Sequence, residues 1–388
     1  MRIGWLLVIL AMFTISLNGT KPIVSLHANG IGASPTEIGF LVSAYAFFPM
    51  LLAIQTGKLL DKIGAKKLTL FGTCAMVIAL TTPILSPTYL SLLFSQSIIG
   101  CATICVIISL QKSVGNNGGN RDKAIALFSL VVSSAEFIGP LYSSFIYEHF
   151  GFRSTFALNA CITLLTVILI LTLPKKRWGK LSKIHDAKHE KTWLLLKHPN
   201  LRKALIISGL VLSSKDLFVA YFPVYGTHIG LRPSEIGMVL SATALMAIVI
   251  RLFQFCLVNR IGRGLLLSVT LIMSALSFVL ISFLDSFYLL LVMAGCLGLG
   301  LGLGQPISLV YAMNMSSVDR HGEVLGLRLT FNRVSQFTAP LLFGGIGSMI
   351  GVGSLFLLMG STIFVTALFT RIHDTSQENE NNHSSKQV

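Results

Sequence analysis

Long runs of apolar residues, separated by short polar breaks, recur along nearly the whole chain. A helix needs about 20 residues to cross the hydrocarbon core of a membrane, and twelve runs reach that length. The runs are continuous and lack the alternation of barrel strands, so they predict helices, whose backbone hydrogen bonds are internal. We expect spans at 4–27, 36–57, 68–86, 88–111, 124–147, 154–173, 204–227, 234–257, 264–284, 287–313, 322–346 and 350–370.

Composition strengthens this prediction, because 53% of the residues are hydrophobic and only 12% are charged. An ordinary soluble domain has about 25% charged residues. The chain is therefore expected to be an all-α membrane protein in contact with the lipid bilayer. The apolar run Gly4–Phe13 after Arg2 could be mistaken for a secretion signal, but no small-x-small pattern ends it, so we expect the first span to be retained.

The basic residues predict the orientation of the chain. If both termini are cytoplasmic, most of the 30 Lys and Arg residues fall in inner loops, and only Arg153 and Arg232 fall outside. The positive-inside rule then predicts a multi-pass cell-membrane protein with both termini in the cytoplasm. The net charge of +15 is explained by basic loops at the anionic inner leaflet, so no nucleic-acid partner is needed.

An unusual octapeptide occurs twice. Residues 32–39 read GASPTEIG and residues 230–237 read GLRPSEIG. Later matches pair Pro140 with Pro340 and Gly151 with Gly351, and they predict two copies of a six-helix unit that start on the same side of the membrane. Glu37 and Glu235 lie at the same position of the two octapeptides, and a carboxylate in a first helical turn favours the helix start.

The two copies predict four parts of the chain. An N-terminal six-helix half (1–174) precedes a basic cytoplasmic linker (175–203), which is followed by a C-terminal half (204–372) and a polar, disordered cytoplasmic tail (373–388). We interpret the linker as a solvated connector, with a surface-lying helix near Trp193–Leu196.

The loop after the second span carries the most specific motif. It reads Gly57-Lys-Leu-Leu-Asp61-Lys62-Ile-Gly64-Ala-Lys66-Lys67 and resembles the signature G-x-x-x-D-[RK]-x-G-[RK]-[RK] of the major facilitator superfamily, with Ala65 at a position that is usually basic. The resemblance implies a fold of twelve transmembrane helices in two pseudo-symmetric halves and secondary transport by alternating access. It also implies a cytoplasmic latch between the halves formed by Gly57, Asp61, Lys62, Gly64, Lys66 and Lys67.

Two further comparisons concern direction and coupling. Gly139-Pro140 in the fifth span is similar to a gating motif of exporters in that superfamily and favours efflux. Proton-coupled exporters of the superfamily often carry an arginine four residues before a glycine in the fourth span, where this chain has Gln96 before Gly100. A standard proton relay is therefore in doubt, and the coupling ion stays open.

Polar and ionisable residues inside the spans are the candidate substrate and coupling site, because such groups are costly in lipid and face a wet interior or each other. Asn18 aligns with Asp216 in the repeat, and Glu136 aligns with Gln336. Arg333 projects about 140° from Arg328, so different partners are expected for the two arginines. The candidates are Asn18, Lys21, Glu136, Lys215, Asp216, Arg251, Arg328, Asn332, Arg333 and Gln336.

Two interpretations of these groups stay open. The acids Glu136 and Asp216 either neutralise basic neighbours, or one of them takes up a proton while an arginine binds substrate. Five cations against two acids favour an anionic or zwitterionic substrate over a lipophilic cation.

Other patterns have structural explanations. The glycine-rich run Gly295–Gly304 lies within the tenth span and indicates close helix packing, not a nucleotide loop. The six cysteines lie in apolar runs without metal-type spacing, so we expect no metal, no cofactor and no enzyme activity.

The preferred function is export of a small organic compound, with a proton as one candidate coupling ion. The alternative is a selective transporter of an anionic or zwitterionic metabolite. A monomer is expected.

Overall fold

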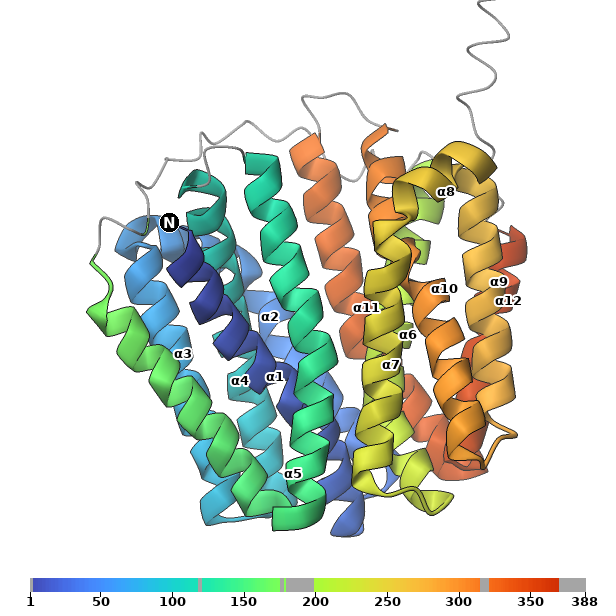
Figure 1. Cartoon of the computed structure of the whole chain (residues 1–388), viewed down its shortest axis with the longest axis horizontal. Coiled ribbons are helices and arrows are strands. Elements are labelled where there is room, and N and C mark those ends of the chain that lie inside the picture. Colours follow the sequence, from blue (N-terminus) through green and yellow to red (C-terminus); the bar gives the residue numbers. More distant parts are fainter. Residues whose placement is uncertain (1–2, 118–120, 175–177, 179–198, 315–320, 370–388) are drawn as a thin grey trace, which may run out of the picture.

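The computed structural model describes residues 3–117, 121–174, 178, 199–314 and 321–369. In this part of the chain the regular structure is helical (Figure 1). The elements are α1 (Gly4–Gly30), α2 (Pro35–Ile63), α3 (Ala65–Leu85), α4 (Tyr89–Asn117), α5 (Arg121–Thr172), α6 (Pro199–His228), α7 (Pro233–Leu252), α8 (Gln254–Ile261), α9 (Arg263–Ile281), α10 (Phe287–Asn314), α11 (His321–Ile350) and α12 (Val352–Phe369).

Most of these helices suit a membrane. In the part of the chain that the structure describes, nine helices are long and apolar enough to cross a membrane. The fifth of them covers 50 residues from Lys123 to Thr172 and consists of two helices that meet at Gly151, so it accounts for two spans. The apolar helix α12 is shorter, and α11 has the length of a span but is less apolar. This arrangement agrees with the predicted all-α fold of twelve spans.

The fifth and sixth spans are separate helices, as predicted, because the label α5 covers two helices that meet at a kink at Gly151, where φ is 78° and ψ is −179°. One predicted boundary was wrong. The predicted single span 234–257 is broken at Phe253 into α7 and α8, and α8 has no buried residue. The linker helix near Trp193–Leu196 and the tail 373–388 lie outside the described residues.

Backbone conformation repeats between the halves. Among the residues that the structure describes, six glycines have positive φ, which only glycine adopts without strain. They form three pairs at equivalent positions: Gly32 (86°) and Gly230 (82°), Gly64 (91°) and Gly262 (81°), Gly151 (78°) and Gly351 (89°). The sequence repeat is therefore also a repeat of turn geometry.

Each octapeptide starts a helix with a capping box, in which a side chain at the third helical position returns to the first capping residue. In α2, the Ser34 N–H donates to Glu37 Oε2 at 2.7 Å, and the Glu37 N–H donates to Ser34 Oγ at 3.3 Å. In α7, the Arg232 N–H donates to Glu235 Oε2 at 2.8 Å. The structural interpretation of Glu37 and Glu235 is confirmed.

The two halves lie side by side. Figure 1 shows the blue-to-green helices of residues 4–172, here called the N-terminal half, beside the yellow-to-red helices of the C-terminal half, residues 199–369. Packing of α2 on α11, of α5 on α7 and of α1 on α6 joins them. Large apolar side chains such as Phe71, Leu90 and Leu342 are exposed at the surface, as expected where lipid replaces water.

Candidate substrate and coupling site

Two ion pairs connect the halves. Lys215 Nζ of α6 lies 2.6 Å from Glu136 Oε2 of α5, and Asp216 Oδ1 of α6 lies 3.9 Å from Lys21 Nζ of α1. Successive residues of a helix project about 100° apart, so adjacent Lys215 and Asp216 reach two different helices of the N-terminal half. Two adjacent residues of α6 thus carry opposite charges, and each one pairs with a residue of opposite charge on a different helix.

A hydrogen-bond chain extends the second pair. Gln336 Nε2 of α11 donates to Asp216 Oδ2 at 2.6 Å, and Gln336 Oε1 accepts from an Arg333 guanidinium N–H at 3.0 Å. Gln336 therefore uses both ends of its amide: it holds the side chain of Asp216 in place and links it to the guanidinium of Arg333. Lys21 Nζ lies over the Tyr45 ring, 5.2 Å from its centre.

These groups line two neighbouring cavities between the halves. The larger, of about 150 Å³, is lined by six of the ten candidates: Asn18, Lys21, Glu136, Lys215, Asp216 and Gln336. The smaller, of about 40 Å³, shares Lys21, Asp216 and Gln336 and adds Tyr45 and Gln96. Lys21, Asp216 and Gln336 therefore stand where the two volumes adjoin, and the pair of Glu136 and Lys215 lines the larger volume alone.

Arg328 and Asn332 belong to a different polar network. Arg328 is 8% exposed and donates to the Gln305 backbone carbonyl at 2.9 Å and to Gln305 Oε1 at 2.6 Å. Asn332 Oδ1 accepts from Ser208 Oγ at 2.8 Å, and Gln305 Nε2 donates to the Ser208 carbonyl at 2.6 Å. This network joins α6, α10 and α11 inside the C-terminal half, so the two arginines of α11 do have different partners.

Arg251, near the end of α7, bridges the halves outside these two cavities. Its Nε donates to the Gly302 carbonyl of α10 at 3.0 Å, and its NH1 donates to Ser133 Oγ of α5 at 2.9 Å. Both hydrogen bonds thus go to neutral groups, while the charge of Arg251 also attracts Glu136. Within the described residues, the sequence candidates fall into three groups: the central ion pairs, the network inside the C-terminal half, and the Arg251 bridge.

The Gly-Pro motif places α5 tightly on α1. A Cβ atom at Gly139 would lie 2.7 Å from the Gly19 backbone nitrogen and 2.9 Å from Asn18 Cβ, so glycine is required for this approach. Pro140 lines the larger cavity with Asn18, whose amide nitrogen donates to the Thr14 carbonyl at 2.9 Å. The motif thus brings α5 into close contact with α1 beside the cavity wall.

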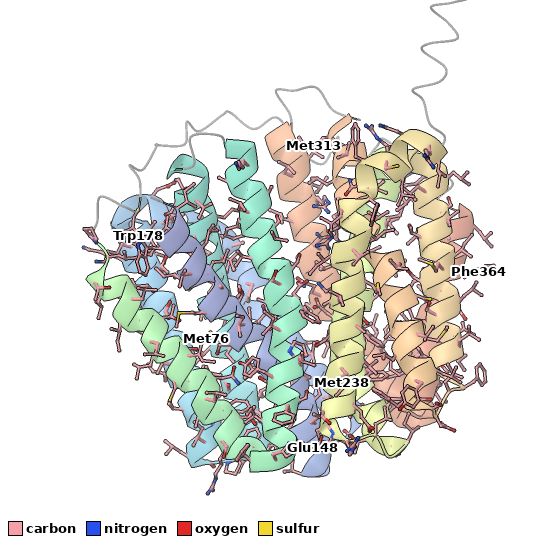
Figure 2. All side chains as sticks on the ribbon, in the orientation of Figure 1. Met76, Glu148, Trp178, Met238, Met313 and Phe364 are labelled. Carbon is pink, nitrogen blue, oxygen red and sulfur yellow. The ribbon has the colours of Figure 1, made fainter. Side chains whose placement is uncertain are left out.

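Three matched contacts close the bundle at the end that carries the octapeptides. The Thr36 N–H donates to Ser348 Oγ at 3.0 Å, and the equivalent Ser234 N–H donates to Glu148 Oε2 at 2.8 Å. Glu148 is labelled at the lower end of the bundle in Figure 2. Each contact joins a helix start of one half to the other half. The next two contacts follow deeper in the bundle.

At the second level, Gly39 of α2 packs against the Pro340 carbonyl, and Gly237 of α7 packs against the Pro140 carbonyl. At the third, Ser43 Oγ donates to the Phe337 carbonyl at 2.8 Å, and Ser241 Oγ donates to the Phe137 carbonyl at 2.7 Å. We call these three levels the octapeptide gate. The residues of the gate are Thr36, Gly39, Ser43, Phe137, Pro140, Glu148, Ser234, Gly237, Ser241, Phe337, Pro340 and Ser348.

Sequence reasoning missed the gate contacts, although the repeat held their signal. The gate residues of α2 and α7 are equivalent at an offset of 198, and those of α5 and α11 are equivalent at an offset of 200. These are the same two offsets that relate the halves in the sequence. Tyr221 was also missed. Its hydroxyl donates to the Pro340 carbonyl at 3.0 Å and to the Pro35 carbonyl at 3.2 Å, and a tyrosine inside an apolar span was the available signal.

The expected latch is not closed between the halves in the part of the chain that the structure describes. Asp61 Oδ1 lies 2.5 Å from Lys112 Nζ of α4, and Lys66 Nζ donates to the carbonyls of Leu171 and Leu173 at the end of α5. Both partners belong to the N-terminal half. Gly57, Lys62, Gly64 and Lys67 complete the motif around the turn at the end of α2.

Groups of metal-binding side chains are absent from the described residues. The chemistry that remains at the site is electrostatic: carboxylates, ammonium groups and amides that can exchange partners when the halves move. Such a set of groups can bind a solute or a proton.

Comparisons with known proteins agree with this geometry. The Major Facilitator Superfamily model matches residues 4–254 and 218–387. Multidrug resistance protein 2 of Bacillus subtilis (strain 168) is 24% identical over 344 residues, which cover 86% of this chain and 85% of the relative. Quinolone resistance protein NorA of Staphylococcus aureus (strain MRSA252) is 21% identical over 333 residues, 84% of each chain.

Solved structures share the fold. The nucleoside transporter NupG superposes with a TM-score of 0.80 at 14% identity, covering 95% of this chain and 98% of NupG. A POT family transporter in complex with thioalcohol conjugated peptide superposes with a TM-score of 0.79 at 14% identity, covering 95% and 94%. The chain thus has twelve spans with transporter-like packing, and it belongs to the Major Facilitator Superfamily of secondary transporters.

Proposed function

We propose that this chain exports a small organic compound across the cell membrane by alternating access, with both termini in the cytoplasm and one chain as the working unit. The observation that carries the proposal is the pair of ion pairs that join the halves beside the cavities. They connect Glu136 with Lys215 and Lys21 with Asp216. These ion pairs can hold the halves together in one conformation of the transport cycle. In the other conformation the charged groups must have different partners.

The cost of separating charges makes these pairs suitable for coupling. A half-buried charge that loses its partner raises the free energy of that state unless another charge, a proton or a solute replaces the partner. Protonation of Glu136 would release Lys215 without leaving a bare carboxylate, and substrate binding near Lys21 would compete with Asp216. A proton is therefore our candidate coupling ion, by a route that needs no arginine at Gln96.

Two observations support export as the direction. The relatives are named for resistance to multiple drugs and to quinolones, and such resistance requires removal of the compound. The Gly139-Pro140 corner contacts both α1 and the cavity, as expected of a gating point. With the octapeptide gate on the outer side, where the positive-inside rule places it, this structure is closed toward the exterior.

The alternative, a selective carrier of an acidic or zwitterionic metabolite, rested on five cations in the cavity. The structure reduces that excess, because Arg251 and Arg328 bind neutral groups away from the two cavities. Lys21 and Lys215 remain in the cavity walls against Glu136 and Asp216, and Arg333 reaches Asp216 only through Gln336. The count of charges therefore no longer favours an acidic ligand by itself, and the argument for one depends on how tightly Lys21 is paired.

Everted membrane vesicles test the proposal. Vesicles that contain the protein and are loaded with an acidic buffer should accumulate a fluoroquinolone, and a protonophore should abolish the accumulation. Glu136→Gln should reduce it, whereas Lys112→Met, outside the cavity, should have a smaller effect. Accumulation only in right-side-out vesicles would show import, and accumulation that ignores the proton gradient would exclude proton coupling.

A further inference from the structure

Lys21 is the least satisfied charge of the central cluster. Its Nζ lies 3.9 Å from Asp216 Oδ1, whereas the Lys215 Nζ lies 2.6 Å from Glu136 Oε2. Coulomb attraction falls with distance, and a contact of 3.9 Å is too long for a hydrogen bond. The Lys21 side chain is also 27% exposed and lines both cavities. It therefore has room to accept a second partner.

The other three charged groups of the cluster are held more firmly. Glu136 is engaged at 2.6 Å by Lys215. Asp216 accepts from Gln336 at 2.6 Å, and Gln336 in turn accepts from Arg333 at 3.0 Å. The charged side chains that face Lys21 are thus Asp216, Glu136 and, behind Gln336, Arg333.

This difference separates ligands by charge. A cationic ligand would have to displace Lys215 from Glu136 or Gln336 from Asp216, and each displacement breaks a short charge-assisted contact. An anionic group would approach Lys21 against the repulsion of the Asp216 and Glu136 carboxylates, but the contact that it has to replace is the long one with Asp216. Asp216 would keep its hydrogen bond from Gln336 during this exchange. Entry of an anion therefore breaks no short charge-assisted contact, whereas entry of a cation breaks one.

The walls around Lys21 indicate the remainder of the ligand. The smaller cavity presents Val24, Val42, Ala46, Val219 and Ala220 as apolar surface. Polar groups are few there: Ser25, Tyr45 and Gln96 besides the cluster itself. A lining that is mostly apolar with a few placed polar groups is typical of sites for small organic molecules. The cavity of about 40 Å³ is too small for such a molecule alone, and the adjoining cavity of about 150 Å³, which Lys21 also lines, supplies further room.

We propose that the transported compound carries an acidic group which binds Lys21, and that its apolar body lies against Val42, Ala46 and Val219. This assignment rests on the proposed export function and names the chemical class of its substrate. The compound enters as an anion, takes the partner position beside Lys21 that Asp216 fills only loosely, and leaves the Glu136–Lys215 pair intact.

A matched series of probes tests the assignment: phenylpropionate, phenylpropionamide and phenylpropylamine, which share one apolar body. Thermal unfolding of the purified full-length protein is followed with each probe, because a ligand that binds the native state raises the midpoint. Phenylpropionate should stabilise the wild type more than the amide or the amine does. Lys21→Met should weaken its apparent affinity about 10- to 100-fold.

Two controls separate charge from folding. Lys21→Arg keeps the cation and should retain the effect, and Lys112→Met removes a cation paired with Asp61 outside the cavity and should leave it unchanged. If Lys21→Met does not fold, Lys21→Gln takes its place. The assignment is overturned if the amine stabilises more than the acid, if none of the probes stabilises, or if the effect of the acid survives removal of the Lys21 charge.

The same probes distinguish this inference from the export function itself. Vesicles that export the amide or the amine but not the acid would overturn the acidic substrate and leave export standing. Vesicles that move none of these probes, no fluoroquinolone and no ethidium would instead refute the proposed export function.

Discussion

Gly39 of α2 lies directly against the carbonyl of Pro340 in α11, and Gly237 of α7 lies against the carbonyl of Pro140 in α5, where a Cβ atom would be 2.7 Å from the oxygen. Each glycine is the last residue of an octapeptide. The repeated sequence is thus required on both sides of one interface, because each half presents its helix start to the Gly-Pro or Ala-Pro corner of the other. The conformational change of transport must separate these surfaces.

Alanine at Gly39 should therefore destabilise the closed octapeptide gate. The added methyl group would meet backbone, which moves less easily than a side-chain end, and overpacking of this kind costs about 1–3 kcal/mol. We expect greater labelling of a cysteine introduced at the neighbouring Val42 by a membrane-impermeant thiol reagent added from the outer side. Gly345→Ala is the matched control, because a Cβ there has no atom within 4 Å.

Labelling that does not change with Gly39→Ala, while Gly345→Ala also leaves it unchanged, would contradict a role for this contact in closing the gate. The six native cysteines are replaced beforehand so that the introduced thiol alone reports.

The hydrogen bond between Glu148 and Ser234 allows a more selective test of the same gate. Glu148→Gln keeps an oxygen that can accept from the Ser234 N–H, whereas Glu148→Ala leaves this first-turn amide without its partner. Loss of one such bond costs about 0.5–1.5 kcal/mol. Glu148→Ala should raise outer-side labelling and Glu148→Gln should raise it less.

Ser348→Ala removes the equivalent acceptor for Thr36 and should resemble Glu148→Ala. Equal effects of Gln and Ala at position 148 would indicate that the carboxylate charge, and not the hydrogen bond, holds this end of the bundle.

The sequence predicted the equivalence of the halves better than the contacts between them. The offsets 198 and 200 paired Gly151 with Gly351 and the two octapeptides with each other, and the structure has both as matched turns and helix starts. A repeat states which residues are alike, but it does not state that Ser43 meets Phe337 and not Phe137. That information lies in how two bundles pack, which depends on side-chain shape over many helices.

The same limit applied to the candidate site. Intramembrane charges were found because lipid makes them costly, yet their cost does not reveal the partner. Arg328 was grouped with the cavity, but Gln305 and Ser308 from α10 surround it inside the C-terminal half. Polar neutral residues on adjacent helices thus decided its place. Lys215 and Asp216 remained ambiguous for a similar reason, since adjacent residues of one helix face different neighbours.

Removal of Arg328 should then affect folding more than ligand choice. Its guanidinium is buried and donates to the backbone and the side chain of Gln305, so Arg328→Ala leaves polar groups of α10 unpaired, at a cost of about 1–3 kcal/mol. We expect a lower unfolding midpoint in detergent and an unchanged ranking of acidic, neutral and basic probes. A reversed ranking at an unchanged midpoint would place Arg328 in the substrate site.

The pair of Glu136 and Lys215 should show strong coupling in a double-mutant cycle. Each single variant, Glu136→Gln or Lys215→Met, leaves one half-buried charge without its 2.6 Å partner, while the double variant leaves neither. The double variant should therefore be more stable than the sum of the single effects predicts, by about 0.5–3 kcal/mol. The contact between Lys21 and Asp216 is longer, at 3.9 Å. A double-mutant cycle with Lys21→Met and Asp216→Asn should therefore give a smaller coupling.

Unfolding midpoints of all six variants, measured in one detergent and at one pH, decide between these expectations. A coupling as large for Lys21 and Asp216 as for Glu136 and Lys215 would mean that Asp216 is the real partner of Lys21 and is not held by Gln336. In that case an incoming anion would have to break a strong pair, and the preference for acidic compounds would lose its physical basis.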